Sequence, residues 1–218
     1  MSIKYSFIAV LLLLSCHSFS QRKNAEIGII TDNDLYTSSK YDMYYTNGLE
    51  LFYKRLIPNN SDKIQKQTIE FKVGQYIYTP RFINTPEKEI MDRPYAGYLF
   101  GEVGSSLFYK NESVLKVDFR LGYLGPNSFG RETQRSFHDL VGYKQVFGWE
   151  FQIQNALALQ AHAVYSKKMF PNSSSDFVDL HFKSEASVGT IFTGASTGLV
   201  SRIGFKKLAP IYDSNLYG

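Results

Sequence analysis

The sequence predicts an all-β protein, an antiparallel transmembrane β-barrel of the outer membrane, because three features occur together. An export signal lies at the start of the chain, and apolar and polar residues alternate over long segments of the remainder. Aromatic residues make up 16% of the 218 residues. Alternating segments of about ten residues are typical of tilted membrane strands, and aromatic side chains are common at both edges of such barrels.

Residues 1–20 have the features of a signal peptide, which leaves residues 21–218 as one β-barrel domain. An apolar run at 7–14 precedes a small-x-small cleavage pattern at 18–20. This run is too short to span a bilayer. Cleavage there removes the only cysteine, Cys16, so the mature chain needs no disulfide. A lipoprotein cut at Cys16 is the alternative, and both cuts imply export.

The composition argues against two other classes of protein. Hydrophobic residues make up 44% of the chain and the mean hydropathy is −0.23, which is too polar for a bundle of transmembrane helices. The formal net charge is only +4 and the basic residues are scattered, so we expect no nucleic-acid partner. We expect the protein to be a monomer.

A period of two dominates the mature chain. Leu115, Val117 and Phe119 alternate with Lys116 and Asp118, which is the pattern of a strand with one apolar and one polar face. The same test predicts strands at residues 25–34, 44–57, 66–78, 95–109, 113–124, 149–166, 176–191 and 192–205.

Two architectures accommodate such strands. A soluble sandwich buries the apolar faces between two sheets, whereas a membrane barrel turns them to lipid and its polar faces to the lumen. The length of the strands and the export signal favour the barrel. The polar faces carry charges at Glu50, Lys54, Glu70, Lys72, Asp118 and Arg120.

The last residues, 209–218, resemble a loop that enters another strand. An open sheet edge in lipid would leave backbone groups unpaired, so a membrane barrel has to close. We therefore expect the chain to be truncated at its C-terminus.

The longest break in the strand pattern, residues 130–149, holds a candidate site. Gln134 and His138 are four residues apart, so they project from one face of a helix. A second polar cluster upstream includes Asn33, Asp34 and Thr46. Carboxylate and amide oxygens suit a calcium ion, although Asp and Asn also form turns. We expect the fold to bring the two clusters together.

Several short motifs recur along the chain in a specific order. They read NDLY, D-x-x-YTNG, GQ-x-IYTP, DRPYAG, LG-x-x-GP, Q-x-x-x-H and GW-x-x-Q-x-x-N. No single motif is decisive, but the ordered set resembles the lipid A deacylase family, the LpxR-type 3′-O-deacylases. The resemblance covers most of the mature chain.

This resemblance implies a calcium-dependent barrel of twelve strands with a short helix in an extracellular loop, in the outer membrane of a Gram-negative bacterium. The implied reaction removes the 3′-linked acyloxyacyl group of lipid A. The implied partners are lipid A, or lipopolysaccharide, and the lipids of the outer membrane. About eight strands are readable here, which agrees with the expected truncation.

The resemblance also assigns roles to residues. It makes His138 the catalytic histidine, with Gln134, Asn33 and Thr46 beside it, and it makes Asp34 and Asn33 the calcium ligands. An imidazole suits a general base that takes a proton from water. Thr46 is either the nucleophile or a group that positions water.

Two positions depart from the family pattern. Lys144 stands where an acidic residue is expected, and Ala156 follows Asn155 where many relatives have Glu. These departures bear on the orientation of the histidine and on the charge around the metal.

Other readings of the sequence remain open. His162 and His181 lie on predicted strands, and we expect them to be structural. A barrel without enzymatic activity, in a structural or adhesive role, is the alternative function. A soluble periplasmic binding sandwich is a third.

Overall fold

The computed structural model describes residues 24–36, 43–83, 87–143, 146–171 and 177–214. The predicted signal peptide at 1–20 and the departure at Lys144 lie outside these ranges.

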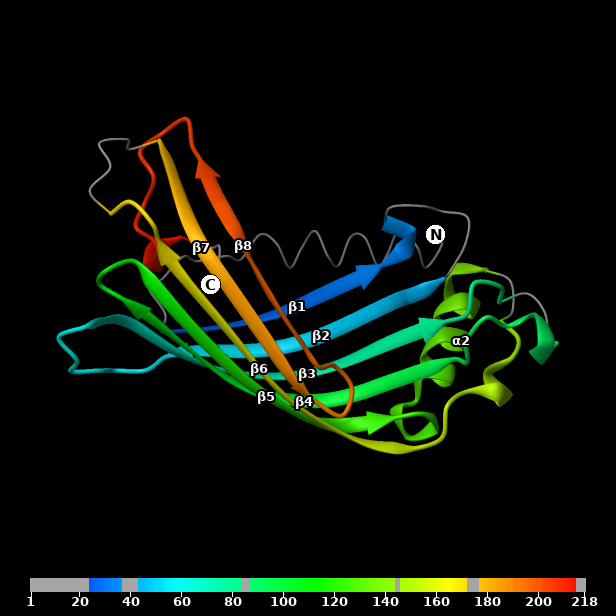
Figure 1. The fold of residues 1–218 in the computed structure, drawn as a ribbon. Coiled ribbons are helices and arrows are strands. Elements are labelled where there is room, and N and C mark those ends of the chain that lie inside the picture. The colour runs from blue at the N-terminus through cyan, green and yellow to red at the C-terminus, as the bar shows by residue number, and fades with distance from the viewer. Residues whose placement is uncertain (1–23, 37–42, 84–86, 144–145, 172–176, 215–218) are drawn as a thin grey trace, which may run out of the picture.

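In this part of the chain, eight strands form one antiparallel sheet, and each strand pairs with its neighbour in sequence (Figure 1). They are β1 (Ala25–Asn33), β2 (Tyr44–Leu56), β3 (Ile64–Thr79), β4 (Ala96–Tyr109), β5 (Ser113–Leu124), β6 (Ala156–Lys168), β7 (Val178–Gly189) and β8 (Gly194–Ile203). The predicted strands are confirmed, and their boundaries agree closely with the structure except at the start of β6.

One α-helix, α2 (Gly130–Val141), interrupts the run of strands between β5 and β6. The described chain also contains five short 3-10 turns: η1 (Asp34–Tyr36), η2 (Lys88–Ile90), η3 (Pro126–Ser128), η4 (Trp149–Phe151) and η5 (Ile211–Asp213). Among the described residues, none of the helices has the length and apolar character needed to cross a membrane. The helix expected around Gln134 and His138 is confirmed.

The strand predicted at 149–166 is wrong in its first part. Residues 149–151 form η4 instead, and β6 begins only at Ala156. Gly148, with φ of 94°, turns the chain so that the side chain of Trp149 is fully buried. The alternation of apolar and polar residues there reflects this buried turn rather than a strand.

The sheet is open within the described ranges, since β1 pairs only with β2 and β8 only with β7. The predicted fold class is therefore confirmed as a mostly β protein of antiparallel strands with one short helix. Closure into a barrel remains a prediction.

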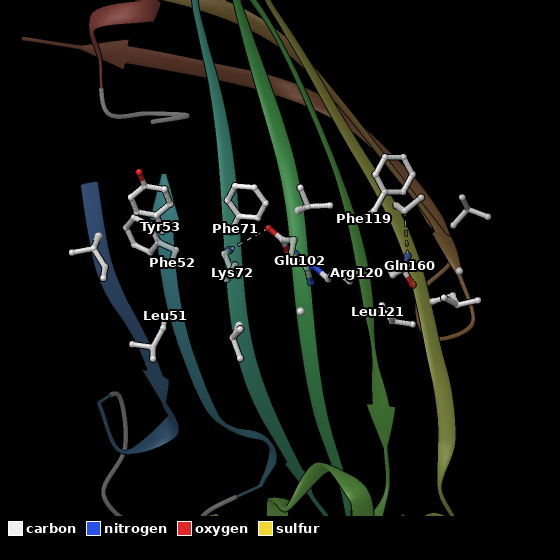
Figure 2. Close-up of a pocket in the computed structure, with 18 residues that line it drawn as sticks. Leu51, Phe52, Tyr53, Phe71, Lys72, Glu102, Phe119, Arg120, Leu121 and Gln160 are labelled. Carbon is white, nitrogen blue, oxygen red and sulfur yellow. Dashed lines mark hydrogen bonds and ion pairs between the residues drawn. The ribbon is translucent and has the colours of Figure 1, made fainter. Parts of the chain in front are cut away.

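The apolar face of the sheet is exposed. Phe71, Phe119 and Leu121 are each about half exposed, which a membrane barrel requires and a sandwich core does not. Figure 2 shows Leu51, Phe71 and Leu121, from three strands, among the side chains that line a hollow on the sheet. The strands thus carry apolar side chains on the face that we call the outer face.

The opposite face, which we call the inner face, carries ion pairs across the strands. Lys72 of β3 lies 2.8 Å from Glu50 of β2 and 3.6 Å from Glu102 of β4. Glu102 also accepts a hydrogen bond from Arg120 of β5, and Figure 2 shows Glu102 between Lys72 and Arg120. Because neighbouring strands supply opposite charges, buried charges on this face are paired. The predicted polar face is confirmed.

Two histidines belong to the inner face. The ring nitrogens of His162 lie 2.8 Å from Asp118 and 3.0 Å from Glu185, so His162 links β5, β6 and β7. His181 is fully buried beside Asp179, at 3.2 Å. Both contacts agree with the structural role expected for these two residues.

Candidate active site

Thr46 occupies a β-bulge. Tyr45 pairs with Tyr78 and Asn47 pairs with Ile77, so Thr46 is an extra residue in β2. A bulge redirects side chains at the end of a strand. The hydroxyl oxygens of Thr46 and Thr79 lie 2.8 Å apart, and both residues are buried.

The bulge also decides which face the polar residues share. Residues directly opposite each other in an antiparallel pair point to the same face. Asn33 is opposite Asn47, and Asn47 is opposite Ile77. Ile77 follows Phe71 at even spacing along β3, so it belongs to the outer face. The amides of Asn33 and Asn47 therefore lie on the apolar face of the sheet, at its end.

Tyr45 points the other way, onto the inner face. Its ring packs edge-on against Tyr76 at 5.6 Å, and its hydroxyl donates to Asp32 at 3.1 Å. Gly48 makes this possible, because a Cβ at that position would overlap the Tyr45 hydroxyl. Asp32 lies within β1 and accepts this hydrogen bond. Tyr45 and Gly48 thus hold the strand end on which Thr46 sits.

Asp34 begins η1 directly after β1. Its Oδ2 accepts a hydrogen bond from the backbone N–H of Met43 at 3.1 Å, so the carboxylate links the two ends of the β1–β2 connection. Asn33 and Asp34 together offer amide and carboxylate oxygens, the donors that calcium prefers. Across the described ranges, no three His, Cys, Asp or Glu side chains group closely enough to hold a metal ion.

Gln134 and His138 share the buried face of α2, as their spacing predicts. They are only 4% and 6% exposed, while the neighbouring Asp139 is exposed. The helix ends at Gly142, which adopts φ of 76° and donates its N–H to the carbonyl of His138. The ring of Tyr143 then packs edge-on against the His138 ring at 5.6 Å. The imidazole is therefore enclosed by the C-terminal end of α2 and the residue that follows it.

Close backbone contact docks α2 on β4. A Cβ at Gly130 would lie 3.0 Å from the Cα of Gly97, so any larger residue would press helix and strand apart at this contact. The preceding turn η3 is held in place by Gln75 of β3, whose amide donates to the carbonyl of Ser128 at 2.6 Å. The helix therefore sits against the ends of two central strands.

Trp149 completes the support of α2. Its indole N–H donates to Oε1 of Gln134 at 2.8 Å, and its ring lies 4.8 Å from that of Tyr95. Ile77 and Val146 complete this buried cluster. Trp149 was predicted to lie in a strand, so its support of α2 was not foreseen. Its signal was that it is the only tryptophan and follows a glycine.

The two predicted clusters lie at the same end of the sheet. Figure 1 shows α2 at the end where β1 finishes and β2 begins. Asn33 at the end of β1, Asp34 in η1 and Thr46 near the start of β2 thus lie at the same end of the sheet as α2. Direct contact between the two groups remains a prediction.

The loop before β4 carries an Asp–Arg pair. Asp92 accepts hydrogen bonds from the backbone N–H of Arg81 at 2.8 Å and from Nε of Arg93 at 3.1 Å. The hydrogen bond from the backbone of Arg81 and, to a smaller extent, the one from the side chain of Arg93 hold the pKa of Asp92 below its ordinary value. The guanidinium of Arg93 also lies 4.0 Å from the centre of the Tyr44 ring. The contact between Arg93 and Tyr44 joins the loop before β4 to the start of β2.

These features define an antiparallel β protein with an exposed apolar face, a charged opposite face, and a histidine-bearing helix docked at one end. The model of the family described as outer membrane protein LpxR matches residues 7–215, so the chain belongs to that family. The resemblance to the lipid A deacylases and the predicted outer-membrane location are thereby confirmed.

A solved structure, LpxR from Salmonella typhimurium, has a similar fold. The TM-score is 0.64 at 23% sequence identity, and the match covers 80% of this chain. The matched region spans 62% of the Salmonella chain. At this identity the likeness concerns the fold alone. The comparison with curated proteins gives no match.

Proposed function

We propose that this protein is an outer-membrane hydrolase that removes the 3′-linked acyloxyacyl group from lipid A. One observation carries the proposal: Asn33 and Asn47 lie on the apolar outer face, not among the charges of the inner face. A soluble substrate would be handled from the polar lumen of a barrel. A lipid in the membrane reaches the outer face directly, so polar residues there suit an ester within a lipid.

The proposal includes a closed barrel, with the sheet β1–β8 as part of its wall. An open edge would leave backbone groups of β1 and β8 unpaired in lipid. Half-exposed side chains such as Phe71 and Leu121 would then contact acyl chains of the bilayer.

In the proposed reaction, His138 is the general base. It takes a proton from water as the water oxygen bonds to the ester carbonyl carbon. The bond from that carbon to the sugar 3′ oxygen then breaks, and His138 returns the proton to this oxygen. The products are a free acyloxyacyl acid and a 3′ hydroxyl. The burial of His138 at a helix end keeps the imidazole in one place, as such transfer requires.

Asp34 and Asn33 would hold the calcium ion, because both supply oxygen donors. Calcium, when bound, supplies positive charge that stabilises the oxyanion of the tetrahedral intermediate. One oxygen of Asp34 accepts a hydrogen bond from the backbone N–H of Met43, so the carboxylate is held at the end of β1.

Thr46 can act in two ways, as nucleophile or as a group that positions water. Its hydroxyl is buried and lies 2.8 Å from that of Thr79, which favours positioning. Arg93, which is exposed, and Arg131, which is half-buried, are cations near this end of the sheet and would meet the phosphates of lipid A. We propose a monomer, with lipid A and outer-membrane lipids as its partners.

Mass spectrometry of lipid A tests this function. We expect lipid A from Gram-negative cells that express the protein to lose the mass of the 3′ acyloxyacyl group. Unchanged lipid A, with the protein folded in the outer membrane, would instead favour the alternative of a barrel in a structural or adhesive role.

A further inference from the structure

We propose that Trp149 is a positioning residue that holds the side-chain amide of Gln134 in a single orientation, with its nitrogen directed to the reaction. The inference rests on the proposed function for its catalytic consequence. The hydrogen bond itself can be tested without any activity.

The chemistry of the contact decides the orientation. An indole N–H can only donate, so the atom of Gln134 that it meets at 2.8 Å must be the carbonyl oxygen. The amide nitrogen lies on the opposite side of the same carbon atom and is turned away from Trp149. Without such a partner the terminal amide has two nearly equivalent orientations. The bond from Trp149 therefore selects one of them.

Trp149 is itself held firmly enough to do this. It is fully buried, and its ring lies 4.8 Å from that of Tyr95. A Cβ at Gly130 would lie 3.0 Å from the indole ring, so the start of α2 rests on the indole. The indole thus fixes both the position of the helix and the amide that projects from it.

The selected orientation has a use in ester hydrolysis. Gln134 and His138 lie one helical turn apart on the same buried face of α2. Negative charge develops on the ester carbonyl oxygen in the transition state, and a fixed N–H donor stabilises it. An amide oxygen in the same place would repel that charge. We therefore assign the Gln134 nitrogen as this donor and Trp149 as the residue that keeps it there.

The first experiment observes the bond directly. Trp149 is the only tryptophan of the chain, so the ¹⁵N-labelled protein in detergent has a single indole N–H signal in NMR. We expect this proton to exchange slowly, and we expect Q134A to shift its signal upfield. Q134E should leave the signal close to its original position, because a carboxylate oxygen still accepts the bond. A signal that is the same in Q134A would overturn the inference.

The second experiment measures deacylation of purified lipid A by the full chain. We expect W149F, which keeps an aromatic ring against Tyr95, to lower kcat by up to about 100-fold with KM unchanged. W149F should cause no further loss in a Q134A background. Q134E should be as impaired as Q134A, although it keeps the bond to Trp149.

V146A is the matched control, because it loosens the same buried cluster without removing a donor. We expect it to lower stability and leave kcat unchanged. If V146A and W149F reduce kcat equally, or if W149F acts equally with and without Gln134, Trp149 merely supports packing and the inference is wrong.

An inactive wild type would overturn the catalytic role together with the proposed function. An active wild type with an equally active W149F would overturn the inference alone.

Discussion

The first residue of α2, Gly130, lies directly against Gly97 of β4, and a Cβ on either residue would be crowded by the other. A Cβ at Gly97 would lie 3.1 Å from the Cα of Gly130 and would overlap the hydroxyl of Ser128. Neither glycine is required by its own backbone angles, since both have ordinary φ values. They are required because helix and strand touch backbone to backbone. The placement of His138 thus depends on two residues that carry no side chain.

The change Gly97→Ala should therefore displace α2. Overpacking at a tight contact costs about 1–3 kcal/mol, and the helix that carries His138 has to move to relieve it. We expect deacylation to fall by up to about 100-fold, as misplaced catalytic groups do. Gly101→Ala on the same strand is the control, since a Cβ there meets open space. Equal activity of both variants would show that α2 tolerates displacement.

Replacing His138 tests the general base. His138→Ala removes proton transfer, which is typically worth about a hundred- to ten-thousandfold in rate. We expect the 3′ acyloxyacyl mass to persist in lipid A from cells that express this variant. The barrel should still fold, because His138 lies on α2 and not in a strand.

Asp139→Ala is the matched control for His138→Ala. Asp139 is the next residue on the same helix and is exposed, so its loss should leave activity intact. His162→Ala is less suitable as a control, because His162 links Asp118 and Glu185. An active His138→Ala variant would rule out the proposed base.

Asp34 provides a test of the metal. The change Asp34→Asn keeps the shape of the side chain but removes the charge that favours calcium. We expect wild-type deacylation to stop in a chelator and return with added calcium. Asp34→Asn should need a higher calcium concentration, whereas Asp62→Asn in the exposed β2–β3 turn should behave as the wild type. Deacylation that is indifferent to chelation would remove calcium from the proposal.

The ion pairs of the inner face make a prediction about stability. Glu102 is almost fully buried between Lys72 and Arg120. The change Glu102→Ala would leave buried positive charge without its partner, which we expect to cost on the order of 3 kcal/mol. Glu26→Ala is the control, because Glu26 is exposed and its ion pair with Lys54 is long, at 3.7 Å. Urea unfolding in detergent should separate the two variants, and equal midpoints would contradict a stabilising role for the inner-face charges.

The sequence alone was enough to predict the strands and the helix. Side chains alternate along a strand with a period of two residues, so Leu115, Val117 and Phe119 reveal β5 without knowledge of its partners. The spacing of Gln134 and His138 likewise indicates a shared helix face. Ordered motifs such as YTNG and DRPYAG identified the family. All of these signals are local in the chain.

Only the tertiary structure decided how these elements meet. The bulge at Thr46 exists because β2 pairs with β3 in a register that skips one residue, and no residue of β2 reveals this by itself. The turn at Trp149 replaces the predicted start of β6 because the indole bonds to Gln134, fifteen residues earlier in the chain. Contacts between residues distant in sequence leave no periodic pattern. The face on which the site lies therefore follows from strand register and helix packing, which only the folded chain determines.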